Sequence, residues 1–172
     1  MTFLKGPKMA IIWTVLRVWL GVQWLQAGIH KVGNFDATGF LHGTIAKSQG
    51  ENAIVKAWYA NFVETFALPN VELFNFLIPW GEVLVGIGLI LGAATIPALL
   101  AGAFMNLNFL LAGTISTNPT LYTAAMILLF AGAASYFYGV DRFALKYMKA
   151  KLNERKNEKD NNDMKHKPAA AH

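Results

Sequence analysis

The sequence contains no cysteine, and it is poor in charge for its length. Without a thiol the chain can form no disulfide, ligate no iron–sulfur cluster through cysteine and run no dithiol exchange. Charged residues make up 15% of the 172 residues, whereas a soluble domain usually carries about a quarter. The composition therefore favours a membrane protein. Redox function stays open, because a bound cofactor or a quinone could carry the electrons.

Long apolar runs dominate the rest of the chain. A helix needs about 20 apolar residues to cross a bilayer. Four runs approach this length and are predicted as membrane spans, at about residues 9–29, 71–91, 96–114 and 121–139. Short connectors after the second and third spans favour antiparallel neighbours. We therefore expect an all-α fold, an integral membrane antiparallel four-helix bundle over residues 1–148, with no room for a separate soluble catalytic domain.

Two more polar segments accompany the predicted spans. Residues 34–70 are expected to form a large outer loop. Its second half, residues 51–66, carries apolar side chains at intervals of four, at Ile54, Trp58, Phe62 and Phe66. This spacing predicts an amphipathic helix that lies on the outer membrane surface or caps the bundle. Residues 149–172 are polar and almost without aromatics, and we expect a disordered basic tail that contacts anionic lipids.

The distribution of charge predicts the orientation. The net charge is +5, and nine of the fifteen basic residues follow Gly139. Lys5 and Lys8 precede the first span. Because positive residues stay on the inner side, both termini are expected in the cytoplasm of a cell membrane protein. A nucleic-acid-binding arm would show a similar charge run, but the apolar segments before it disfavour that alternative. A cleaved signal peptide is disfavoured because Arg17 interrupts the first apolar run.

Arg17 and Glu82 are ionisable residues within predicted spans, where a charge costs at least about 2.5–3.5 kcal/mol and should be paired. Arg17 is eight residues from the inner end of the first span, or about 12 Å, and Glu82 is nine from the inner end of the second, or about 14 Å. Similar depths predict that the two side chains meet. The pair would either hold two helices together or also line a substrate site, and geometry alone leaves both open.

A polar cluster is expected around this pair. Asn106 in the third span has a depth similar to that of Glu82, and Trp24 and Trp80 flank the cluster. Such a group could hydrogen-bond a quinone carbonyl while the indoles stack on the ring. The alternative is that these polar side chains only join the helices to one another.

Other patterns give weaker signals. The run Gly86-Ile87-Gly88 followed by Gly92 imitates a dinucleotide-binding pattern, but in an apolar segment it indicates close helix packing. A haem held between facing helices is not expected, since only His30 lies near a span. No metal site is expected either. His30 and Lys31 could exchange protons at the outer face, or could simply anchor the helix at the interface beside Asp36.

Three strings in the sequence resemble the DoxX/DoxD family of small four-helix membrane proteins. They are WLQAGIHKVGNF from Trp24 to Phe35, GEVLVGIGLILG from Gly81, and NLNFLLAGTISTNP from Asn106 to Pro119. The last string is the most specific, and the resemblance covers about residues 16–139. It implies a membrane subunit similar to those of thiosulfate:quinone oxidoreductase, which pass electrons from a small sulfur compound to quinone.

By this resemblance, the motif positions are Arg17, Lys31, Glu82, Asn106 and Asn108. In a quinone-linked oxidoreductase Arg17 would hold an anion or a quinone oxygen, Glu82 would handle the proton, and the two asparagines would orient the ring. The expected partners are the lipid bilayer and either a second oxidoreductase subunit or further copies of this chain. The alternative function is a non-catalytic scaffold or chaperone-like subunit that docks a partner protein. A transporter is disfavoured, because no inverted repeat is visible.

Overall fold

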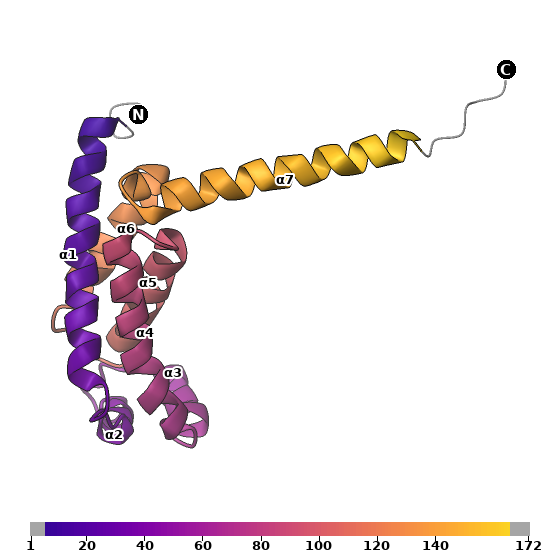
Figure 1. Ribbon diagram of the computed structural model, residues 1–172. Helices are drawn as coiled ribbons and strands as arrows, with labels where there is room; N and C mark the ends of the chain where they lie inside the picture. The colour runs from indigo at the N-terminus through magenta and orange to yellow at the C-terminus, as the bar shows by residue number, and fades with distance from the viewer. Residues whose placement is uncertain (1–5, 166–172) are drawn as a thin grey trace.

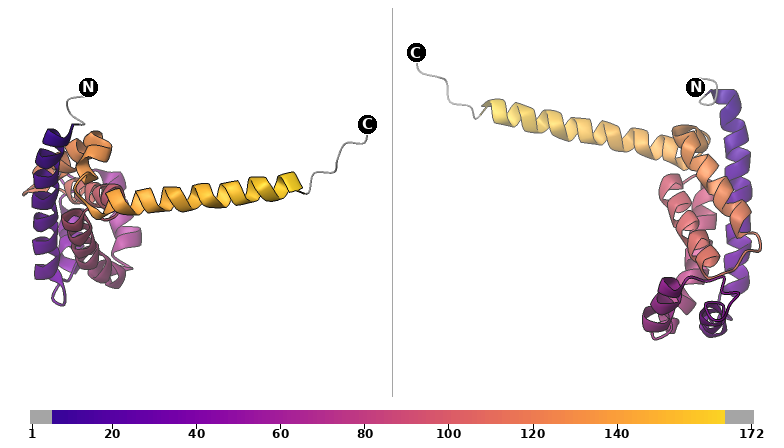
Figure 2. Two further views of the ribbon diagram at one scale, coloured as in Figure 1. Left: turned by 45° about the horizontal axis from the view of Figure 1, so that its top comes forward. Right: turned by 180° about the vertical axis from the view of Figure 1, so that it is seen from behind.

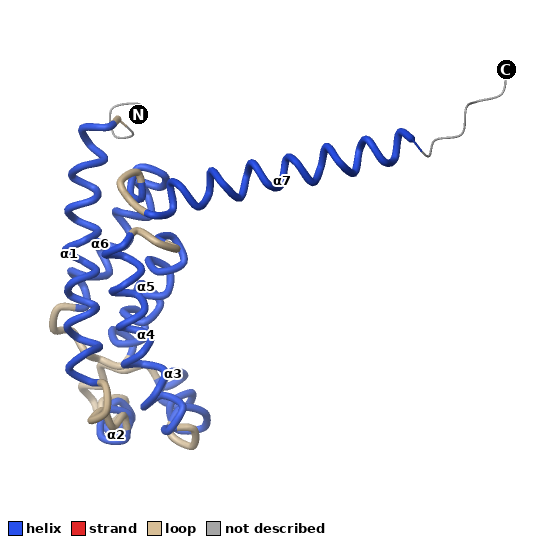
Figure 3. The backbone as a smooth tube through the Cα atoms, in the orientation of Figure 1, coloured by secondary structure: helices blue, strands red, loops and turns tan. Residues whose placement is uncertain are grey.

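The computed structural model describes residues 6–165, and every regular element within that range is a helix (Figures 1 and 3). The all-α prediction is thus confirmed for these residues. In chain order the elements are α1 (Pro7–Lys31), α2 (Thr38–Ala46), α3 (Ala57–Phe62), the π-helical turn η2 (Val63–Ala67), α4 (Val71–Leu91), α5 (Thr95–Leu111), α6 (Asn118–Ala131), the 3₁₀ turn η3 (Gly132–Tyr136) and α7 (Val140–Lys165).

The long helices α1, α4, α5 and α6 pack side by side, with α2 and α3 gathered at one end of the bundle (Figures 1 and 2). Large side chains from these four helices form the main core, including Leu20, Trp24, Leu89, Leu99 and Leu128. A second, smaller core joins α2 and α3 to the ends of the bundle helices through Leu41, Tyr59 and Val63. The end that carries α2 and α3 is called the outer end below, and the opposite end is called the inner end.

Proline and glycine set the ends of several helices. Pro7 and Pro119 lie in the first turns of α1 and α6, where a missing N–H leaves no helical hydrogen bond unmade. Gly92 ends α4 in the left-handed conformation, with φ of +64°, which glycine adopts without a side-chain penalty.

Glycine also brings α1 against α4, the closest pair of helices in the bundle. A Cβ atom at Gly28 would lie 2.7 Å from the backbone nitrogen of Val83, and one at Gly86 would lie 2.6 Å from that of Leu25. Gly21 faces Ile90 in the same way, so the two helices run antiparallel. The Gly86 pattern thus serves close helix packing, and this contact fixes the register of α1 on α4.

Two helices are long and apolar enough to cross a membrane, the one at Val71–Leu91 and the continuous helix at Asn118–Tyr136. Helix α5 is apolar but shorter. Many large apolar side chains of the bundle are exposed, among them Val15, Leu84, Phe104 and Phe130, as expected of a surface that faces lipid. The structure therefore has membrane-type helices, while the count of four spans and their orientation stay predictions.

Two expectations about the connecting segments need correction. The outer loop contains α2, which the sequence analysis did not predict, and its second helix begins at Ala57 rather than at residue 51. Residues 149–165, predicted as disordered, continue α7 as a helix. The segment 140–165 contains neither glycine nor proline, and 16 of its 26 residues are Lys, Arg, Ala, Leu, Met or Glu, which favour helix even without a core to pack on. The remainder of the predicted tail, 166–172, lies outside the described residues.

Candidate functional site in an outer cavity

Arg17 and Glu82 do not pair, and this prediction was wrong. Glu82 Oε1 accepts a hydrogen bond from Lys31 Nζ at 2.5 Å. The Arg17 guanidinium instead donates Nη2–H to the carbonyl oxygen of Tyr138 at 2.9 Å. The buried carboxylate is therefore matched by the lysine at the outer end of α1.

The depth count failed because the inner ends of α1 and α4 are not level. Helix α1 extends beyond the inner end of α4 (Figure 1), so Arg17 lies beside Gly92, the residue that ends α4. Lys31 follows Arg17 by fourteen residues in the same helix, which separates them by about 21 Å along its axis. Equal residue counts from two span ends thus did not mean equal heights.

Arg17 belongs instead to an inner junction, where the end of α4 meets the start of α7. A Cβ atom at Gly92 or at Gly139 would collide with the Arg17 guanidinium, so the two glycines make room for it. Asp141 accepts hydrogen bonds from the backbone nitrogens of Ala94 and Thr95, both at 2.7 Å. Since these nitrogens open α5, Asp141 caps that helix and ties α7 to the bundle.

Glu82 and Lys31 lie in a cavity of about 310 Å³ at the outer end, called the outer cavity. Its lining residues come from α1 and the segment after it, from α2, α4 and α5, and from the loop between α5 and α6 with the start of α6. Its lining combines aromatic side chains with a few polar ones: Trp24, Ala27, Lys31, Phe35, Phe40, Glu82, Phe109, Thr114, Ser116, Thr117, Asn118 and Leu121. Apolar walls with few polar groups are typical of small-molecule sites.

The two charges differ in their access to solvent. Glu82 is only 1% exposed, whereas the Lys31 side chain is 32% exposed. Lys31 Nζ also lies 5.7 Å and 5.5 Å from the ring centres of Phe35 and Phe109, within cation–π range. The second carboxylate oxygen of Glu82, Oε2, is buried and has no hydrogen-bond partner within residues 6–165. A buried charged oxygen without a partner is costly, so this atom is suited to accept a hydrogen bond from a ligand or water.

Two further buried polar groups lie nearby. Trp24 lines the outer cavity, and its indole lies against Gly102 of α5, where a Cβ atom would be 3.1 Å from Nε1. Asn106 follows one turn later on the same face of α5 and is fully buried. In the described part of the chain, neither the indole N–H nor the Asn106 amide has a hydrogen-bond partner. The Trp24 indole N–H is thus an unused donor in the cavity that holds Glu82, whereas the Asn106 amide lies one turn from Gly102 and is not part of the cavity lining.

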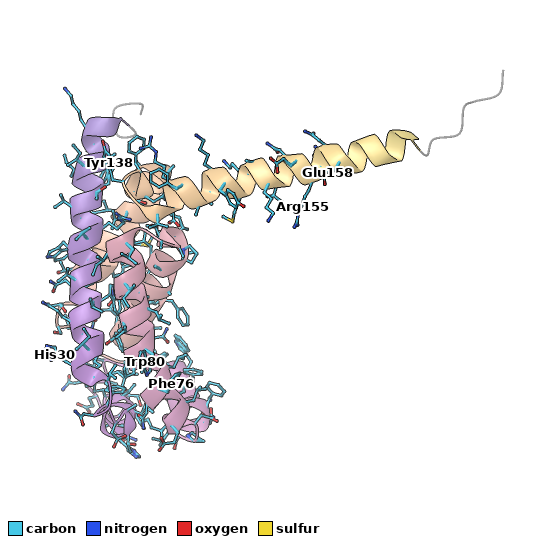
Figure 4. All side chains as sticks on the ribbon, in the orientation of Figure 1. His30, Phe76, Trp80, Tyr138, Arg155 and Glu158 are labelled. Atoms are coloured by element: carbon cyan, nitrogen blue, oxygen red, sulfur yellow. The ribbon has the colours of Figure 1, made fainter. Side chains whose placement is uncertain are left out.

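Trp80 and Asn108, predicted at the same site, lie elsewhere. Trp80 is exposed and packs on Phe76 on the outside of α4 (Figure 4). The Asn108 side chain accepts a hydrogen bond from the hydroxyl of Tyr59 at 3.2 Å and donates one to Phe104 O at 2.8 Å. Burial raises the pKa of Tyr59, which keeps its hydroxyl protonated as the donor. Asn108 therefore joins α5 to α3.

Several cavity residues were missed by the sequence analysis, chiefly Phe35, Phe40, Phe109 and the segment 114–118. A signal for most of them was present, because Phe35 ends one of the family strings and Phe109 and 114–118 lie in the most specific one. Only the asparagines and charges of these strings were singled out. The loop at Ser116, which has a positive φ of +36°, carries short polar side chains to the cavity mouth.

Over residues 6–165, fold and site together define a helical protein with membrane-type helices and a mostly apolar cavity with a buried ion pair at the outer end of its bundle. The chain belongs to the DoxX family, since the DoxX family model matches residues 12–115. This match confirms the resemblance noted from the sequence, and it contains every predicted site residue but not α6 or α7. No curated protein matches the chain significantly, and neither does any solved structure.

Proposed function

We propose that the protein is the membrane subunit of a quinone-linked oxidoreductase and that the outer cavity binds the quinone head group. The observation that carries this proposal is the buried Glu82 carboxylate, which has one oxygen bonded to Lys31 and the other unpartnered beside aromatic walls. The DoxX match supports it independently, because it covers the part of the chain that supplies most of these residues.

The cavity fits a flat, mostly apolar ring with two polar ends. Its volume of about 310 Å³ is near the lower limit of the roughly 300–1,000 Å³ typical of small-molecule sites. Phe35, Phe40 and Phe109 supply aromatic surface for stacking. The Lys31 ammonium and the Trp24 indole N–H are donors suited to quinone carbonyl oxygens, and Glu82 Oε2 is an acceptor suited to a quinol hydroxyl.

A bound quinone supplies the two-electron chemistry, and the protein residues position it and handle protons. Lys31 Nζ would hold a carbonyl oxygen and stabilise the negative charge that reduction places there. Glu82 would hold the proton transferred to or from that oxygen, with Lys31 as its link to the partly exposed side of the cavity. The aromatic walls would exclude water. Asn106 is a positioning residue beside Trp24 in this proposal.

The electrons must come from a donor outside the bundle. The chain has no cysteine to ligate an iron–sulfur cluster or to form a redox disulfide. The proposal therefore includes a second oxidoreductase subunit, with a small sulfur compound such as thiosulfate as the electron donor implied by the family resemblance. Further copies of this chain are the other partner that the proposal accommodates.

The test is quinone binding to the purified protein in lipid nanodiscs, followed by titration with a short-chain quinone. We expect quinone among the co-purified lipids and about a tenfold loss of affinity in Glu82→Gln, because a hydrogen bond to a charged group is removed. Trp80→Phe is the matched control, since Trp80 lies in the same helix outside the cavity, and its affinity should not change. Equal affinity in all three proteins, with no co-purified quinone, would reject the proposal.

The non-catalytic scaffold is the second candidate, and the long exposed helix α7 favours it because this helix offers a surface for a partner protein. The double substitution Lys31→Met with Glu82→Gln separates the two functions. It removes both charges of the outer cavity while conserving side-chain volume. A scaffold would retain its partner binding, whereas the oxidoreductase would fold but no longer bind quinone.

A further inference from the structure

The first three turns of α7 have a two-sided sequence that the proposed function does not use. Between 140 and 152, apolar side chains recur at helical spacing: Val140, Phe143, Ala144, Leu145, Tyr147, Met148 and Leu152. Within this stretch the basic side chains Arg142, Lys146 and Lys149 occupy the opposite arc, whereas Lys151 lies on the apolar side. A basic face opposite an apolar face is typical of a helix that lies in a membrane interface.

Most of the apolar arc of α7 is exposed in the described structure. Phe143 is 73% exposed and Tyr147 is 68% exposed, and Met148 and Leu152 are exposed as well. A row of exposed aromatic and aliphatic side chains of this kind indicates contact with another apolar surface.

The direction of α7 places that arc along a membrane surface. Helix α7 leaves the inner end of the bundle crosswise to the long axes of α1 and α4, in all views (Figures 1 and 2). If the bundle crosses a bilayer along its length, α7 runs parallel to the bilayer plane. The inner junction holds this direction, because Asp141 N–H donates to Gly92 O at 2.8 Å while the Asp141 carboxylate caps α5.

The exposed apolar side chains of α7 lie on the side of the helix that would face the membrane. Tyr147, Met148, Lys151, Leu152 and Arg155 border one shallow surface of α7. Figure 4 shows Arg155 on the side of α7 toward which the bundle extends, which is the side of the membrane. The apolar arc therefore faces the lipid, and the long basic side chains beside it can reach the headgroups.

The excess of basic residues in this part of α7 favours a membrane surface of anionic lipid. Residues 140–156 contain six Lys or Arg, whereas their acidic residues are Glu154 and Asp141, which is engaged at the α5 N-terminus. We propose that Val140–Leu152 is an interfacial helix whose apolar arc enters the leaflet at the inner end of the bundle and whose flanking basic side chains bind anionic lipid headgroups. The DoxX match ends at residue 115, so this surface lies outside the family region.

The test places a single fluorophore on either side of α7 in the full chain. Because the natural sequence has no cysteine, Met148→Cys and the matched control Lys149→Cys each give one labelling site. The labelled proteins are reconstituted in vesicles of phosphatidylcholine with phosphatidylglycerol, and quenching by nitroxide on the lipid acyl chains is measured. We expect at least about twofold stronger quenching at position 148 than at position 149.

The charge requirement is tested with Lys146→Gln, Lys149→Gln and Lys151→Gln combined in the Met148→Cys protein. Each removed cation lowers partition to an anionic surface about fivefold, so the triple change lowers it on the order of a hundredfold. Quenching should fall toward the level of the Lys149→Cys control, as it should in pure phosphatidylcholine vesicles. Circular dichroism confirms that each variant keeps its helix content.

Two results would overturn the proposal. Equal quenching at positions 148 and 149 would show that α7 does not lie with its apolar arc in the leaflet. Weak quenching at position 148 that rises when the protein is diluted into more lipid would assign the arc to contact with a second copy of the chain.

Discussion

At the scale of single residues, Lys31 compensates the charge of the buried Glu82 carboxylate. The carboxylate is buried at the outer cavity, and the lysine is its sole charged hydrogen-bond partner in the described structure. Removing one member of a buried pair leaves a charge without compensation. Substituting each member alone and then both together therefore separates the contribution of the pair to stability from its contribution to quinone binding.

Lys31→Met alone should destabilise the protein by about 3 kcal/mol, because Glu82 is left charged and unmatched. Adding Glu82→Gln should restore most of that loss. The measurement is thermal unfolding in mild detergent for the two single variants and the double variant. A double variant no more stable than Lys31→Met would contradict the pairing.

The same cycle with Arg17 is a direct test of the corrected arrangement. Arg17 lies at the inner junction, about 21 Å along α1 from Lys31, so its coupling to Glu82 should be absent. We expect the losses of Arg17→Gln and Glu82→Gln to add within about 0.5 kcal/mol in thermal unfolding. A coupling above about 1 kcal/mol would support direct contact and refute the structure at this point.

The sequence singled out three residues that line the outer cavity, Trp24, Lys31 and Glu82, but it paired the wrong two charges. The residue type alone predicts that a carboxylate within an apolar span is paired and belongs to a functional site. Its partner depends on the register between α1 and α4, which glycine contacts such as Gly28 against Val83 determine. A register of this kind is a property of the packed pair and cannot be obtained by counting from estimated span ends.

At the scale of helices, the contact between α1 and α4 should be sensitive to a single methyl group. A Cβ at Gly28 would meet backbone atoms of Val83 and Pro79 at 2.7 and 2.9 Å, and backbone cannot move aside cheaply. Gly28→Ala should therefore lower stability by about 1–3 kcal/mol in thermal unfolding.

Gly39→Ala is the control for this substitution, since nothing lies within 4 Å of a Cβ there. Gly39 lies within α2, so the alanine should be neutral or add up to about 1 kcal/mol through helix propensity. Similar losses at both positions would argue against close packing at Gly28.

The N-terminus of α5 gives the next prediction. Asp141→Ala removes the acceptor of two backbone N–H groups and should cost about 1–2 kcal/mol in thermal unfolding. Spin-label distances between α7 and α5 should broaden at the same time, because Asp141 also holds α7 in place. A narrow distance distribution in the variant would mean that Arg17 and the glycines of the inner junction fix α7 without Asp141.

Helix boundaries were predictable to different degrees. The predicted span 71–91 coincides with α4, because its apolar run ends at a glycine that takes the left-handed conformation. Helix α7 was predicted wrongly from Lys149 onward, because a polar composition almost without aromatics was taken as disorder, although many of its residues favour helix. Helix α2 was missed, since its mixed sequence between two long spans gives no clear period.

At the scale of the whole molecule, the two ends of the bundle differ in chemistry. The outer end carries the cavity with Lys31 and Glu82, and exposed aromatic residues of α3 and η2 such as Trp58 and Phe66. The inner end carries Arg17, Asp141 and the basic first turns of α7. Aromatic residues gather at membrane interfaces and positive residues at the cytoplasmic side, so this polarity predicts a single orientation in the bilayer.

Single-cysteine labelling tests this orientation on the intact chain. Lys8, Gln49 and Lys149 are exposed at the start of α1, after α2 and on α7, and the natural sequence has no competing thiol. With an impermeant maleimide added to sealed right-side-out vesicles, Gln49→Cys should react while Lys8→Cys and Lys149→Cys react only after the membrane is opened. Because α1 is the only long helix between Lys8 and Gln49, labelling of both from one side would show that α1 does not cross the bilayer. The outer cavity would then not lie at the far face, and Lys31 could not serve as its link to the external solvent.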